Sequence, residues 1–314
     1  MRLLAAALLL TARASTCPPG ARILTRERRA AAEPPRAMPA DLAWAFTRCN
    51  ASAVGDFFVD DSRGGRGTHY RHSRKDMTAR VEAAKAALSH PRALTAARGS
   101  ATLAWQLDAL RVPRVARALR GGAAVVFGSI APTVEALLLA GGAASVLVVE
   151  YNNLTYDHPL VAHARPHEVA AAWDAGGAAP GGAREASFDL AVSFSSFDHD
   201  GLGRYGDALA PDGDLLAMDF MARFLKRGGT ALVSVPVGTD VVWWNLMREY
   251  GPVRLPLLHA GWHTVDAVGW DASRLGAPRP KPGPGAPYEP VFVLERDAAA
   301  GAPPAAGAPP APEL

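Results

Sequence analysis

Cysteine is nearly absent from the 314-residue chain, with two copies only. Cys17 and Cys49 show no Cys-X-X-Cys spacing, which excludes a cysteine zinc site and leaves a single disulfide open. The sequence also lacks a basic stripe interleaved with aromatic residues, because its one tight basic cluster is confined to residues 26–29. Although the net charge is +3 at pH 7, nucleic acid is therefore not an expected partner.

A hydrophobic run long enough to cross a bilayer is missing as well. The chain begins with one early arginine, an apolar segment at residues 3–10 and the small-residue pattern Ala12-Arg13-Ala14. This order is typical of a secretory signal, and the segment is too short for a transmembrane helix. We therefore expect the lumen of the secretory pathway (Golgi or endoplasmic reticulum) or secretion. An organellar transit peptide is the alternative, because the stretch up to Arg36 is rich in arginine and nearly free of acids.

Two glycosylation sequons bear on this expectation. Asn50-Ala51-Ser52 fits a lumenal protein. The second sequon, Asn153-Leu154-Thr155, follows closely after Glu150, a residue that we predict to bind a ligand. A glycan at Asn153 would therefore be expected to crowd that ligand.

Composition divides the chain into four segments. Residues 1–37 are the predicted targeting segment and a Pro/Ala linker, and 38–120 form an N-terminal helical extension. Residues 121–297 alternate strand and helix patterns, which predicts one α/β domain. Residues 298–314 are almost entirely Ala, Gly and Pro, and such a tail cannot bury enough surface to fold.

The stretch 123–152 has the pattern of a nucleotide-binding βαβ unit. An apolar strand at 123–127 breaks at Gly128, and a short helix after Pro132 leads to a second apolar strand at 146–149. That strand ends on Glu150, about 20 residues beyond the glycine, where an acid binds ribose hydroxyls in dinucleotide-binding folds. The loop holds one glycine only, so a βαβ unit that serves packing alone stays open.

The second half of the domain continues the alternation. A buried strand at 188–194 runs into a polar, glycine-punctuated loop, which places that loop at the ligand-binding edge of the sheet. Helices are expected from Asp212 and over 241–250, and strands at 230–235 and 291–294.

Five short sequences resemble known families. They are Glu-Tyr-Asn at 150, the loop SFSSFDHDGLGRYGD at 193–207, VPVG at 235, YGPVRLPLLHAGW at 250 and the turn LKRGG at 225. The turn is similar to that of class I S-adenosylmethionine-dependent methyltransferases, and the others resemble the family named domain of unknown function 268. The resemblance implies a Rossmann-like, doubly wound and mostly parallel sheet of seven strands that ends in an antiparallel hairpin.

The resemblance also implies a cofactor, S-adenosylmethionine, and the residues that bind it. Gly128 and Ser129 would let the backbone approach the methionine part of the cofactor, and Glu150 would hold the ribose. Tyr151 would lie beside the adenine. The end of the fourth strand, with Phe194, Ser195 and Ser196, would lie near the sulfonium.

His199 is the candidate catalytic base, since methyl transfer to a hydroxyl or amine requires loss of a proton and a histidine titrates near neutral pH. Asp198 or Asp200 would orient it, and Arg204 and Tyr205 would bind the acceptor. The alternatives are a histidine that hydrogen-bonds to the loop backbone and an Arg-Tyr pair that pins the loop.

Asp207 is a further candidate for substrate binding, and with Asp212 and Asp214 it could hold a divalent ion, although capping of a turn and a helix is favoured.

Three functions follow from this pattern. The leading one is a methyltransferase that acts on a small-molecule or glycan acceptor. The sparse glycine loop, and Asp198 where the family usually has Glu, favour the second, an inactive methyltransferase-like binding protein. The third is a nucleotide-sugar-dependent glycosyltransferase, which requires an Asp-X-Asp motif at a strand end; Asp212-Gly213-Asp214 has these letters but precedes a helix.

Overall fold

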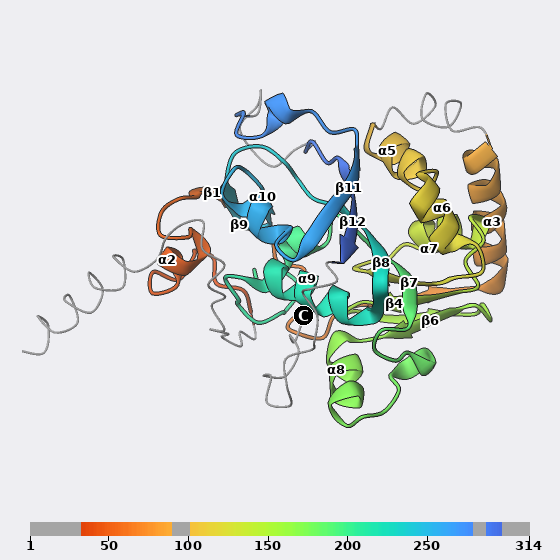
Figure 1. Ribbon diagram of the computed structural model, residues 1–314. Coiled ribbons are helices and arrows are strands. Elements are labelled where there is room, and N and C mark those ends of the chain that lie inside the picture. Colours follow the sequence, from red (N-terminus) through yellow and green to blue (C-terminus); the bar gives the residue numbers. More distant parts are fainter. Residues whose placement is uncertain (1–32, 90–100, 279–286, 297–314) are drawn as a thin grey trace, which may run out of the picture.

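The computed structural model describes residues 33–89, 101–278 and 287–296, so the predicted signal and the Ala/Pro tail lie outside its described part. A sheet of seven strands forms the centre, in the order β11-β12-β8-β7-β3-β4-β6 (Figure 1). In chain order the strands are β3 (Ala123–Phe127), β4 (Ser145–Val149), β6 (Val161–Ala164), β7 (Phe188–Phe194), β8 (Leu225–Ser234), β11 (Trp262–Val268) and β12 (Val291–Arg296). β12 runs antiparallel to both of its neighbours, and the other pairs are parallel. The predicted fold class, a mostly parallel sheet that ends in an antiparallel hairpin, is confirmed.

Helices cover both faces of this sheet because its central strands are apolar on both sides. In β3, Val125 and Phe127 face one core and Val126 faces the other. The first core is closed by α8 (Pro166–Asp174), α9 (Gly213–Phe224) and α10 (Arg254–Leu258). The second is closed by α3 (Arg74–Ser89), α5 (Ala101–Ala109), α6 (Pro113–Leu119) and α7 (Thr133–Ala140), which group together in Figure 1.

Two smaller sheets join the N-terminal region to the rest of the chain. β2 (His69–His72) pairs in parallel with β5 (Asn153–Tyr156), directly after the βαβ unit. β1 (Ala53–Phe57) pairs in parallel with β9 (Val241–Asn245), which also pairs with β10 (Met247–Glu249). The predicted N-terminal extension therefore contains strands as well as helices, the first of which is α2 (Ala43–Phe46).

The prediction of a helix over residues 241–250 is wrong. This segment is the hairpin of β9 and β10, and Trp244 lies in a small core with Phe46 and Leu202. β-Branched and aromatic residues suit a strand, and the partner β1 lies almost 190 residues earlier in the chain, where a local pattern cannot reveal it. Within the described residues, no helix combines the length and the apolar character needed to cross a membrane.

Candidate functional site

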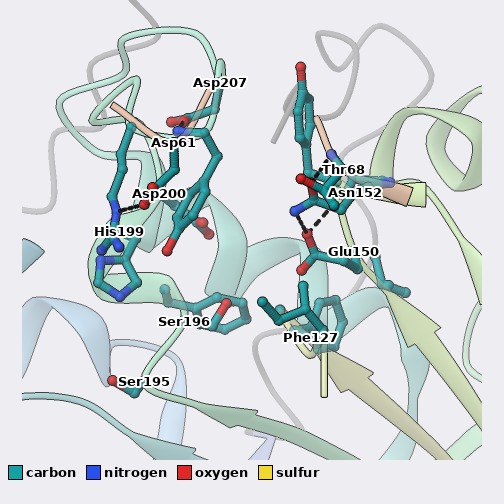
Figure 2. A pocket seen from close by; sticks show the side chains of 18 of the residues that line it. Asp61, Thr68, Phe127, Glu150, Asn152, Ser195, Ser196, His199, Asp200 and Asp207 are labelled. Atoms are coloured by element: carbon teal, nitrogen blue, oxygen red, sulfur yellow. Dashed lines mark hydrogen bonds and ion pairs between the residues drawn. The ribbon is translucent and has the colours of Figure 1, made fainter. Parts of the chain in front are cut away.

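A cavity of about 360 Å³ lies at the carboxyl ends of β3, β4 and β7. Figure 2 shows Glu150, Asn152 and Thr68 on one wall, and His199, Asp200 and Asp207 on the opposite wall. Ligands of open α/β sheets bind at this edge, and the volume lies in the range of small-molecule sites. Of the residues predicted from the sequence, ten line the cavity: Gly128, Glu150, Tyr151, Ser195, Ser196, His199, Asp200, Arg204, Tyr205 and Asp207.

Gly128 forms the turn after β3 with a φ of 71°, in the left-handed region. A Cβ atom at this position would clash with Ser196 Oγ, so the β3 and β7 loops touch here only because residue 128 is glycine. Ser129 is buried and does not line the cavity, since its hydroxyl donates to the Ala131 carbonyl at 3.2 Å. Ile130 lines the cavity in its place.

Glu150 follows β4 and is 8% exposed. Its Oε1 accepts hydrogen bonds from the backbone N–H of Asn152 at 2.9 Å and from that side chain's Nδ2 at 2.8 Å. Burial raises the pKa of the Glu150 carboxyl, and the hydrogen bonds from Asn152 partly oppose this rise. Both hydrogen bonds go to the same carboxylate oxygen, Oε1, and the Glu150 carboxylate lies at the cavity wall (Figure 2).

Phe194, the last residue of β7, does not line the cavity. Alternation along the strand turns its side chain to the core under α3 and α7. Phe197 lines the cavity instead, from the short 3-10 helix η2 (Phe197–His199), and packs edge-on against Phe127 at 5.6 Å between ring centroids. Ser195 stays at the cavity, but its hydroxyl donates to Glu289 Oε1 at 2.9 Å.

His199 projects from η2 into the cavity (Figure 2). Its Nδ1 lies 2.6 Å from the Leu246 carbonyl oxygen. Since a carbonyl only accepts, Nδ1 carries the proton, and the neutral ring has its lone pair on Nε2. The orienting group is thus a backbone carbonyl of the β9–β10 hairpin rather than the predicted aspartate.

Asp198, the neighbour of His199 in the sequence, is fully buried and is not part of the cavity lining. Its Oδ2 is 3.5 Å from His199 Nε2, and neither carboxyl oxygen accepts a hydrogen bond within the described residues. Burial raises the pKa of Asp198, and the nearby His199 opposes this. Asp198 is therefore placed to stabilise a positive charge on His199 through space.

Asp200 and Asp207 stand on the same wall but differ in their contacts. Asp207 holds the loop together, because its carboxylate accepts the backbone N–H groups of Gly201, Gly203 and Tyr205 at 2.8, 3.1 and 3.2 Å. Asp200 Oδ2 is buried and has no hydrogen bond within the described residues. Burial and the neighbouring Asp207 raise the pKa of Asp200 well above its ordinary value.

Arg204 and Tyr205 line the cavity as a stacked pair, with the guanidinium 4.8 Å from the ring centroid. Arg204 Nε also donates to Asp61 Oδ2 at 2.7 Å, so the residue pins the loop, and its other nitrogens have no hydrogen bond within the described part of the chain. Burial raises the pKa of Tyr205 to about 12. Binding of an acceptor by Arg204, Tyr205 and Asp207 stays a prediction.

Residues 121–274 match the family model described as "Caenorhabditis protein of unknown function, DUF268". Residues 121–274 are a DUF268 domain. The resemblance stated from the sequence is thus confirmed. Together with β12, which follows the matched residues, this domain forms the seven-stranded sheet of a methyltransferase-like α/β fold.

The chain is also similar to solved methyltransferase structures, at low identity. One is an S-adenosylmethionine-dependent methyltransferase from Mesorhizobium loti, with 12% identity, coverage of 61% of this chain and 98% of that one, and a TM-score of 0.38. Another is the 1,6-didemethyltoxoflavin-N1-methyltransferase of Burkholderia thailandensis, solved with S-adenosylhomocysteine, with 19% identity, 61% and 80% coverage and a TM-score of 0.38. A search of curated proteins finds no match to the chain. The strand order, rather than these scores, identifies the fold.

Part of the cavity lining comes from outside the DUF268 domain. Asp61, Arg63, Thr68 and Tyr70 line the cavity, from the segment that precedes and begins β2. The Thr68 backbone N–H donates to Asn152 Oδ1 at 2.8 Å, and the Asp61 backbone N–H donates to the Arg204 carbonyl at 2.9 Å. These residues were not predicted, because a loop rich in Gly, Arg and Asp carries no local signal of what it contacts.

The two aspartates of the Asp-X-Asp sequence, Asp212 and Asp214, belong to a buried ion-pair network. Asp214 is fully buried and accepts from Arg254 Nη2 at 2.5 Å and Nε at 2.9 Å. Asp212 is paired with Arg48 at 3.2 Å. Within the described residues there is no group of three or more His, Cys, Asp or Glu side chains that could hold a metal ion. These two aspartates hold the fold together at the start of α9.

Proposed function

We propose that the DUF268 domain binds S-adenosylmethionine in the cavity and transfers its methyl group to a small-molecule or glycan acceptor. The observation that carries the proposal is the buried carboxylate of Glu150 at the end of β4, beside the glycine turn of β3. In nucleotide-binding βαβ units an acid at this place binds the ribose hydroxyls. The glycan class of acceptor rests on the predicted secretory signal alone.

The cavity residues suit such a cofactor. Asn152 holds Oε1 of Glu150, so Oε2 is the oxygen offered to a pair of ribose hydroxyls. Gly128 keeps the β3 turn free of a side chain, which lets a ligand approach the backbone. Phe127, Val149 and Ile130 supply apolar surface for a nucleoside. Asp200 lines the cavity, and its buried Oδ2 has no hydrogen bond within the described residues. A cation such as the sulfonium or ammonium group of the cofactor would stabilise the ionised form of this carboxyl.

When bound, S-adenosylmethionine supplies the methyl group and leaves as S-adenosylhomocysteine. The chain's own residues position the acceptor and remove its proton. His199 Nε2 accepts that proton, because Leu246 keeps the other ring nitrogen protonated. Asp198 then stabilises the imidazolium from 3.5 Å, in a buried setting where charge interactions are strong.

The glycosyltransferase alternative finds no support in the site. Asp212 and Asp214 are buried and neutralised by arginines, so they do not offer oxygens to a metal and a diphosphate. The remaining alternative, a binding protein without turnover, shares the cofactor site and differs only in the chemistry at His199.

Calorimetry with S-adenosylhomocysteine tests the cofactor site. We expect micromolar binding by the wild-type chain and binding about 10- to 100-fold weaker in Glu150→Gln, since a hydrogen bond to a charged group contributes about 1.5–3 kcal/mol. Glu82→Gln, at an exposed acid of α3, is the matched control and should bind like the wild type. His199→Gln should keep binding and lose transfer. A folded wild-type chain that binds neither S-adenosylmethionine nor S-adenosylhomocysteine would contradict the proposal.

A further inference from the structure

Two Asn-X-Ser/Thr sequons remain outside the proposed chemistry, Asn50-Ala51-Ser52 and Asn153-Leu154-Thr155. Such sequons accept N-linked glycans in chains that enter the secretory pathway. We propose that the folded protein carries N-linked glycans at both Asn50 and Asn153. The geometry of each asparagine and the state of Cys49 support this assignment.

Asn50 lies at the tip of a sharp turn between α2 and β1. Arg48, Cys49 and Asn50 have φ angles of 49°, 60° and 65°, so three successive residues are left-handed and the chain reverses abruptly. The side chain of Asn50 is exposed, while its backbone N–H donates to Thr47 Oγ1 at 3.1 Å. A sugar on the side-chain nitrogen leaves this backbone contact intact.

Cys49, next to Asn50, is disulfide-bonded. Cys17, the other cysteine of the sequence, lies outside the described residues. Structural disulfides form in oxidising compartments such as the lumen of the endoplasmic reticulum, where N-glycans are also attached. The bonded Cys49 and the signal-like start of the sequence are independent indications of the same compartment.

Asn153 begins β5, one residue after the cavity residue Asn152. Successive residues of a strand point to opposite sides, and the burial pattern follows this rule: Asn153 and Thr155 are exposed and Leu154 is buried. The exposed side chain of Asn153 is not part of the cavity lining, whereas Asn152, which precedes the strand, is. A glycan at Asn153 leaves the Glu150 site open, contrary to the crowding expected from sequence distance alone.

Secretion of the full chain from a eukaryotic cell line tests the assignment. Peptide-N-glycosidase should lower the intact mass by two glycans and convert Asn50 and Asn153 to aspartate, which peptide mapping detects on the wild-type protein without any variant. Asn50→Gln and Asn153→Gln should each remove one glycan, and the double variant both. Thr155→Ser keeps the second sequon and should keep its glycan, whereas Thr155→Ala should lose it.

The same peptide mapping can also overturn the proposal. A full chain that is unmodified at both asparagines after passage through the same cells removes it altogether. Occupancy of a single site removes the assignment of the other. Because the readout is a mass and does not involve the cavity, it is independent of whether S-adenosylmethionine binds.

Discussion

At the scale of single residues, Gly128 determines both the backbone conformation of the β3 turn and the space left beside Ser196 in the cavity. Gly128→Ala should lower the free energy of unfolding by about 2–4 kcal/mol, from a left-handed φ and a clash with Ser196 Oγ. In a Ser196→Gly background the clash is relieved, and the same substitution should cost only about 1–2 kcal/mol, the backbone part. Urea denaturation of the four proteins measures both values. Equal costs in the two backgrounds would show that Ser196 does not confine residue 128.

Glu150 gives a pH dependence that can be derived from its burial. Its pKa in the free protein is raised above the ordinary value of 4.5, and ribose hydroxyls donate stronger hydrogen bonds to an ionised carboxylate than to a protonated one. Binding therefore favours the ionised form and releases a proton. The affinity for S-adenosylhomocysteine should rise as pH increases through the raised pKa and then level off. Calorimetry in buffers of different ionisation enthalpy measures the released proton, and Glu150→Gln should remove the pH dependence.

These residues also mark the limit of what the sequence predicts. Gly128 and Glu150 were found because a βαβ unit fixes both positions by local spacing. Phe194 was misplaced, because strand alternation turns it to the core and the cavity takes Phe197. The contact of His199 with the Leu246 carbonyl was not predictable, since it depends on a hairpin 47 residues away in sequence.

At the scale of elements, a buried ion-pair network joins α9, β10 and α10. Asp214 and Arg254 are both fully buried, and Tyr250 donates its hydroxyl to Asp214 Oδ2 at 2.9 Å. Arg248 donates to the carbonyl oxygens of Asp200, Ala210 and Pro211, which fixes the polar loop that carries His199. The network therefore supports the site through the loop without lining the cavity.

Asp214→Asn should destabilise the protein by about 3–5 kcal/mol at neutral pH, because it removes the main charge partner of the buried Arg254 and leaves only the 3.4 Å contact with Asp212. The arginines lower the pKa of Asp214 from 3.8 to about 2, so its stabilising contribution is present above about pH 4 and is lost as pH falls through about 2. The difference between wild type and variant should shrink over that interval.

Arg254→Met is the companion variant. Because the two side chains share one network, adding it to Asp214→Asn should cost less than the sum of the single substitutions. Additive costs, or a difference that does not shrink between about pH 4 and pH 2, would contradict the pairing as the source of stability. Denaturant midpoints for the four proteins across the pH series decide this.

The elements themselves were predicted where their pattern is local. The buried strands at 123–127 and 188–194 and the helix before Gly141 could be placed from apolar runs and glycine stops. The prediction for the segment 241–250 was wrong because Val241, Val242 and the two tryptophans fit both the helical and the strand periodicity of apolar residues. Pairing with the distant strand β1 makes this segment a strand.

At the scale of the whole molecule, the N-terminal region is part of the same core as the sheet. Met77, Leu107, Val115 and Leu119 are buried in one cluster with strand residues of the DUF268 domain. The boundary predicted at residue 120 separates two composition patterns, but a helical layer and four residues of the cavity lining lie on its N-terminal side: Asp61, Arg63, Thr68 and Tyr70. Sequence composition alone could not reveal this, because burial depends on which surface a helix meets.

A fragment that begins at Gly121 should therefore fail to fold cooperatively. Removing α3, α5 and α6 uncovers the apolar face formed by Val126, Val148 and Leu190, and an exposed patch of that kind promotes aggregation. It also removes β2 and β1, which leaves β5 and β9 without their parallel partners. Residues 15–297, expressed in parallel, are the control and should show one sharp urea transition. If the fragment 121–297 unfolds with the same midpoint and binds S-adenosylhomocysteine equally well, then the N-terminal region is an appendage, and the cavity residues that it supplies play no part in the cofactor site.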